Sequence, residues 1–65
     1  MNNYYMIIVI SKRNTILNEY NVKYLDILKD DMNLLYPDLD INSLIQNKEF
    51  ISASGLKFLY HHFNW

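Results

Sequence analysis

The chain has 65 residues, of which 51% are hydrophobic, 15% aromatic and 20% charged, and its formal net charge is −1. This length supports one hydrophobic core and this apolar content excludes intrinsic disorder, so we expect a single domain over residues 1–65. Cysteine is absent, which excludes disulfides and thiolate metal sites, leaves packing or oligomerisation to supply stability, and fits a reducing, cytoplasmic compartment.

The first predicted element is a strand from Tyr4 to Ile10 (YYMIIVI), an uninterrupted apolar run that the polar residues 11–14 close. Its β-branched and aromatic residues favour a strand, and the lack of alternation is typical of a strand covered on both faces. Seven residues are too few for a membrane span, which needs about 20. Basic residues follow the run instead of preceding it, which argues against a signal peptide. We therefore expect no membrane association.

Residues 15–20 (TILNEY) have two interpretations. They can return as a second strand through a turn at residues 12–14, or they can be irregular, because their alternation is imperfect. If they do not pair, the edge of the first strand is free to pair with a second copy of the chain. The sequence is thus compatible with a monomer or with a homodimer through the N-terminal strand.

A helix is predicted from Val22 to about Tyr36, with Asn21 as its N-cap. Pro37 ends it, because proline cannot donate the next backbone hydrogen bond. The apolar positions of this helix follow a three-four-three spacing, which places them on one face, toward the core. These inward positions are Leu25, Leu28, Met32 and Leu35.

A short helix is predicted next, over residues 41–47, capped by Asp38 or Asp40. Its apolar residues Ile41 and Leu44 share a face, together with Ile45. A connector at residues 48–52 follows the helix.

The C-terminal segment has two interpretations. In the first, Ser52 or Ser54 caps a third helix that ends at Phe63. In the second, residues 49–52 and 56–60 form a hairpin, because Gly55 weakens the helix. The apolar face of the helix would consist of Leu56, Leu59, Tyr60 and Phe63. The predicted fold class is α+β, with an N-terminal strand or β-hairpin packed on two or three helices.

Residues with catalytic chemistry are sparse. His61 and His62 are adjacent, so they point in different directions on a helix or a strand and cannot readily hold one metal ion. The single glycine, Gly55, excludes a glycine-rich phosphate loop. No serine or carboxylate lies at catalytic spacing from either histidine. We expect no enzyme activity and no cofactor or metal.

The acidic residues concentrate in the middle of the chain. Residues 26–40 contain five aspartates and one lysine. With the core stripe turned inward, Ile27 and Leu34 fall on the far side of the predicted helix, beside Asp30 and Asp31. One interpretation is a solvated helix face, or a face that another element covers. The other is a recognition patch with apolar anchors and an acidic rim. The predicted partner-binding residues are Asp26, Ile27, Asp30, Asp31, Leu34 and Asp38.

These features favour a small non-catalytic protein that binds, and inhibits, another protein through an acidic surface. The partner would offer a basic groove of the kind that normally holds nucleic acid. In size and charge distribution the chain is similar to anti-CRISPR and anti-restriction proteins. Asn, Ile, Tyr and Lys supply 28 of the 65 residues and use A- and T-rich codons, which fits a phage or mobile element whose product acts in the host cytoplasm.

The first alternative is a small DNA- or RNA-binding regulator. The net charge of −1 argues against direct nucleic-acid binding, since a phosphate backbone requires a basic surface. The alternative would need the bases to converge in space, and these are Lys12, Arg13, Lys23, Lys48 and Lys57. A second alternative is a self-assembling structural module.

Overall fold

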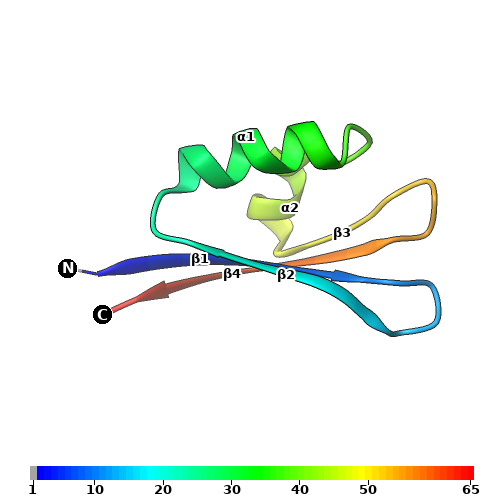
Figure 1. Ribbon diagram of the computed structural model, residues 1–65, viewed down its shortest axis with the longest axis horizontal. Coiled ribbons are helices and arrows are strands. Elements are labelled where there is room, and N and C mark those ends of the chain that lie inside the picture. Colours follow the sequence, from blue (N-terminus) through cyan, green and yellow to red (C-terminus); the bar gives the residue numbers. More distant parts are fainter. Residues whose placement is uncertain (1) are drawn as a thin grey trace.

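Two short helices lie on one side of a four-stranded antiparallel sheet, as Figure 1 shows. The structure is a computed structural model that describes residues 2–65. Its elements are β1 (Asn3–Ile10), β2 (Ile16–Val22), α1 (Leu25–Leu35), α2 (Ile41–Asn47), β3 (Glu49–Ile51) and β4 (Lys57–Asn64). The strand order is β2-β1-β4-β3, so the first and last long strands are central neighbours.

The predicted fold class is wrong in its balance of strand and helix. The domain is strand-rich, with 41% of its residues in strands and 28% in two short helices. The third helix does not exist, and residues 49–64 instead form the β3–β4 hairpin. Gly55 turns this hairpin with a φ of +89°, a conformation that favours glycine. Ser52 does not cap a helix, because its Oγ accepts a bond from the Leu56 N–H within the turn (3.1 Å).

β1 pairs with a strand on each side. Ile7 lies opposite Tyr20 of β2 and opposite Tyr60 of β4. Residues 16–22 are therefore a strand, and β1 has no free edge that could pair with a second copy. Only one face of β1 is covered, because both helices lie on the same side (Figure 1). The prediction of a strand covered on both faces is wrong for the single chain.

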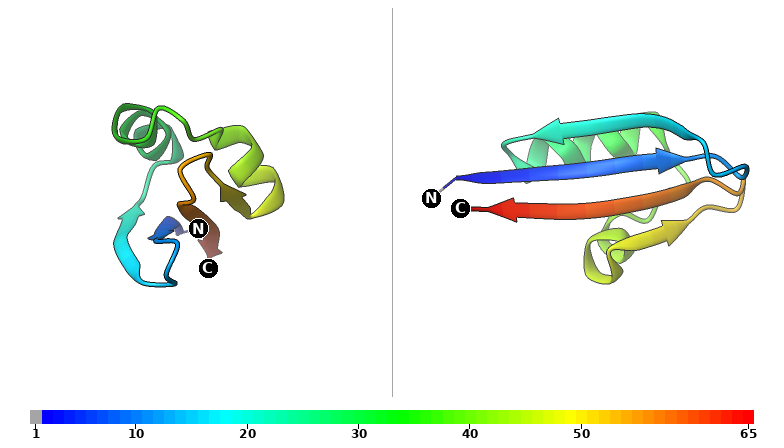
Figure 2. Two further views of the ribbon diagram at one scale, coloured as in Figure 1. Left: turned by 90° about the vertical axis from the view of Figure 1, so that its right-hand side faces the viewer. Right: turned by 90° about the horizontal axis from the view of Figure 1, so that it is seen from below.

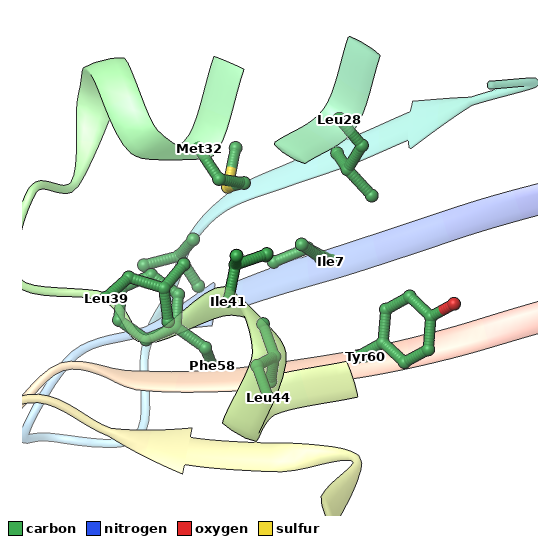
Figure 3. Packing of buried hydrophobic residues seen from close by; sticks show 9 residues of the cluster. Ile7, Leu28, Met32, Leu39, Ile41, Leu44, Phe58 and Tyr60 are labelled. Carbon is green, nitrogen blue, oxygen red and sulfur yellow. The ribbon is translucent and has the colours of Figure 1, made fainter. Parts of the chain in front are cut away.

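The hydrophobic core fills the space between the sheet and the two helices (Figure 3). Side chains alternate across a strand, so every second residue of β1 and β4 points into it. The helices contribute residues spaced by three or four, and the loop between them contributes one leucine. The core consists of Ile7, Val9, Leu28, Met32, Leu39, Ile41, Leu44, Phe58 and Tyr60.

α1 begins three residues later than predicted. Asn21 is part of β2 and does not cap the helix, and the N-cap is Tyr24, which makes no side-chain bond. Leu28 and Met32 are buried as predicted, but Leu35 is 53% exposed because the chain turns away there toward Pro37. The helix ends at Leu35, ahead of the proline, in agreement with the prediction.

α2 has the predicted bounds, and the structure selects Asp40 as its cap. The Ser43 N–H donates to Asp40 Oδ1 (3.2 Å), which satisfies one of the free N–H groups of the first turn. Ile41 and Leu44 are buried against the sheet. Neither helix in the described residues 2–65 is long and apolar enough to cross a bilayer.

A tyrosine pair ties β2 to the end of α1. The hydroxyl groups of Tyr20 and Tyr36 are 3.2 Å apart, and the Tyr36 ring packs edge-on against Phe58 with centroids 5.1 Å apart. The hydrogen bond to Tyr20, together with burial, raises the pKa of Tyr36 to about 12. Burial also raises the pKa of Tyr60. Both tyrosines are thus held in their neutral form.

Replacement of Leu28 by alanine should lower the free energy of unfolding by about 2 to 5 kcal/mol, because it leaves a cavity between α1 and the sheet. Leu35→Ala is the matched control on the same helix, and its loss should be far smaller because that side chain is more than half exposed. Urea denaturation measures both. Equal losses for the two variants would show that the phase of α1 is wrong.

Alkaline pH should destabilise the protein through the tyrosine pair. The unfolded state loses the Tyr36 proton near pH 10 and the folded state only near pH 12, so the stabilisation is complete below pH 10 and is lost as pH rises toward 12. Tyr36→Phe keeps the ring and removes this titration. The decline of the unfolding free energy over that range should therefore be shallower in the variant. An equal decline would contradict the assignment.

Candidate functional site

All six residues of the predicted partner-binding set are exposed. Four of them gather on the outer side of α1, since Ile27, Asp30, Asp31 and Leu34 are spaced by three, four and seven residues. We call these four residues the α1 patch. Asp26 lies in the first turn of α1, and Asp38 lies beyond the helix, after Pro37.

The two apolar members of the α1 patch are not covered by another element. Ile27 is 51% exposed and Leu34 is 82% exposed. Neither β1 nor the C-terminal aromatic residues reach them, because α1 packs on the sheet through its opposite side, at Leu28 and Met32. Asp40, the remaining aspartate of the acidic segment, is the cap of α2. This capping role distinguishes Asp40 from Asp30 and Asp31, which lie beside Ile27 and Leu34 on α1.

A second apolar surface lies on the side of the sheet that faces away from the helices. The right-hand view of Figure 2 looks onto this side, and no helix lies in front of the strands. The paired residues of β1 and β4 on it are Tyr4 with Phe63, Met6 with His61, and Ile8 with Leu59. We call this side the open face. The sequence did not indicate an uncovered side, because the uninterrupted apolar run of β1 predicts a strand that is covered on both faces.

The open face is shallow and not a closed pocket. One depression, of about 410 Å³, lies over Met6, Ile8, Leu59 and Phe63. Another depression, of about 570 Å³, lies where the chain ends meet, beside Tyr4, Lys23 and Trp65. The Tyr4 and Trp65 rings stack on each other with centroids 5.3 Å apart, which leaves no room for a third ring between them. Neither hollow has walls that would enclose a small substrate.

The two histidines lie on opposite sides of β4. His62 stacks on Tyr5 (4.6 Å between centroids) and its Nε2 is 2.8 Å from Asn3 Oδ1. His61 contacts Phe63 on the open face (4.3 Å between centroids). Within residues 2–65, no group of three or more His, Cys, Asp or Glu side chains is placed to hold a metal ion.

The basic residues do not form one patch in the described part of the chain. The Lys12 side chain lies against Gly55, at the end of the sheet where Ile10 pairs with Lys57. Lys23 lies at the other end, with its Nζ 6.0 Å from the centre of the Tyr4 ring. β1 spans about 27 Å between these ends at about 3.4 Å per residue. Lys23 is thus separated by the length of β1 from Lys12 and Lys57, which lie at the same end of the sheet.

No family model, no curated protein and no solved structure matches the chain significantly.

The melting temperature should not change on addition of EDTA, Zn²⁺ or ATP, because a ligand that binds the folded state stabilises it and its removal destabilises it. Thermal denaturation followed by circular dichroism is the measurement. A shift of several degrees with any of the three additions would contradict the expectation that the protein binds no metal or nucleotide.

Proposed function

We propose that this protein is a non-catalytic inhibitor that binds another protein through the α1 patch. The observation that carries the proposal is the exposure of two large apolar side chains, Ile27 and Leu34, on either side of Asp30 and Asp31. Apolar anchors surrounded by a charged rim are the usual composition of a recognition surface. A solubilising helix face would have no need of these apolar residues.

The spacing of the anchors indicates how the partner is bound. Ile27 and Leu34 are seven residues apart, which is two turns of α1, or about 10 Å along its axis. A helix with anchors at this spacing lies in a groove of its partner, with its apolar side chains in pockets. The aspartates between them favour a groove lined by Lys or Arg, the kind of surface that holds nucleic acid. The partner is therefore a basic protein, and occupation of its groove would inhibit it.

The length and composition of the chain support a particular source and place of action for this inhibitor. A 65-residue chain that is rich in residues with A- and T-rich codons and has one acidic helix suits a phage or mobile-element inhibitor of the anti-CRISPR or anti-restriction type, which would act in the host cytoplasm. Such an inhibitor needs a stable fold and one binding surface, and no catalytic group.

Replacement of both anchors by serine should separate binding from folding. The partner is first captured from host cells with the tagged wild-type protein, and its dissociation constant is then measured with purified components. The Ile27→Ser, Leu34→Ser variant should melt near the wild-type temperature and bind at least about tenfold more weakly, equivalent to about 1.4 kcal/mol.

The matched control is Ile16→Ser, Leu17→Ser, which removes two apolar side chains from β2 that are also more than half exposed. It should bind with wild-type affinity. A folded anchor variant with unchanged affinity would overturn the proposal.

The aspartates of the α1 patch should act mainly on the association rate. Asp30→Asn, Asp31→Asn removes two charges from the rim, so association should slow and its dependence on salt should flatten, with a smaller change in dissociation. Stopped-flow or surface plasmon resonance measurements at several salt concentrations test this. An association rate that is equally salt-dependent in the variant and the wild type would show that the acidic rim does not meet a basic partner.

A further inference from the structure

The open face is an apolar surface that the described part of the chain, residues 2–65, leaves uncovered. The central strands β1 and β4 carry apolar residues there at almost every position, and His61 and Lys57 are the exceptions. Phe63 is 40% exposed and Trp65 is 63% exposed, while Met6, Ile8 and Leu59 are partly exposed. Its apolar members are Tyr4, Met6, Ile8, Ile10, Leu59, Phe63 and Trp65. Antiparallel sheets with one solvated side usually carry polar residues on that side, so this pattern is that of a face packed against another layer.

We propose that a second copy of this chain covers the open face, so that the protein is a dimer of two sheets packed face to face. The pairing would place the two sheets about 10 Å apart, with the helices of each copy on the outside. The same residues meet from both copies, as a twofold axis requires. The first strand would then be covered on both faces, which is what its uninterrupted apolar sequence indicates.

The size of the open face fits a dimer whose formation depends on concentration. The strands β1 to β4 have 8, 7, 3 and 8 residues, and each residue covers about 3.4 Å by about 4.8 Å of the sheet. The face thus measures about 420 Å² on each copy. Two such faces bury about 850 Å² in total, which is the size of the smaller, transient interfaces.

The charges of the open face favour a second copy of the chain over a partner with a strong net charge. Strand alternation places Glu19, Glu49 and Lys57 on the open face. Lys48 borders the depression over Met6 and Leu59. Two acids and two bases balance, so two copies do not repel each other. A face that bound nucleic acid, or a strongly acidic or basic protein, would carry an excess of one sign.

The free edge of the sheet is less suited to association than its face. β2 is the exposed long edge, but the Glu19 N–H already donates to Asn18 Oδ1 (3.1 Å). An irregularity between Val9 and Ile10 also breaks the regular register of β2. Both features oppose the addition of another strand. Dimerisation is thus expected through the face and not through a strand edge.

The mass of the protein in solution tests the dimer. Sedimentation velocity up to millimolar concentration should give twice 7.9 kDa for the wild type. Met6→Lys, Leu59→Lys puts two charges at the centre of the open face and should give a single-chain mass with an unchanged circular dichroism spectrum. The control Ile27→Lys, Leu34→Lys adds the same charges to the α1 patch and should remain a dimer. A wild-type protein that is monomeric throughout would overturn the proposal and leave the face to a different protein.

Cross-linking keeps the test decisive if the lysine variant fails to fold. The chain has no cysteine, so single-cysteine variants report one position each. Met6→Cys, near the centre of the open face, should give covalent dimers with a short bis-maleimide. Leu34→Cys, on the outside of the dimer, should not. Equal yields for the two variants, or a dimer that forms only with Leu34→Cys, would contradict face-to-face packing.

Discussion

The central position of β1 is the constraint on which the rest of the structure depends. Ile7 and Val9 are fully buried, and both lie between a partner residue on β2 and one on β4. This double pairing fixes the register of β2 and β4 against β1, because a slip of one residue would turn side chains out of the core. The helices are placed by the same residues, since Leu28, Met32 and Leu44 pack on the side where Ile7 and Val9 point.

A chain of this length cannot cover both sides of the sheet that β1 organises. Its two short helices suffice for one side, and the turns use most of the remaining residues. The other side of β1 and β4 is nonetheless apolar, so the single chain leaves hydrophobic area in water that would favour burial by about 25 cal/mol per Å². A second copy supplies the missing layer without extra sequence, and small domains that lack disulfides and metals commonly gain stability this way. The α1 patch lies outside this layer and stays free for a different partner.

The sequence allowed the first strand, most of α1, the stop before Pro37 and the bounds of α2 to be predicted, because each depends on a local signal, and the structure selects Asp40 from the two candidate caps of α2. The C-terminal strand could not be assigned, and the reason is physical. β4 carries Phe58 and Tyr60 toward the core and Leu59 and Phe63 toward the open face, so it has no polar side and no alternation. Its apolar residues also fit the spacing of a helix, and periodicity cannot separate the two. The position of Ile27 and Leu34 on the far side of the helix followed from helix spacing. Their exposure, like that of the open face, depends on where the other elements lie, which the sequence does not encode locally.

The helices of the same chain cover one face of β1, and we propose that a second copy covers the other. Methyl NMR with a soluble paramagnetic agent, recorded over a range of protein concentration, measures both faces at once. The Ile7 and Val9 methyl groups should be protected at every concentration, while those of Met6, Ile8 and Leu59 should be broadened in dilute solution and protected as concentration rises. Broadening of Met6, Ile8 and Leu59 at all concentrations would contradict the dimer, and broadening of Ile7 and Val9 would contradict the fold.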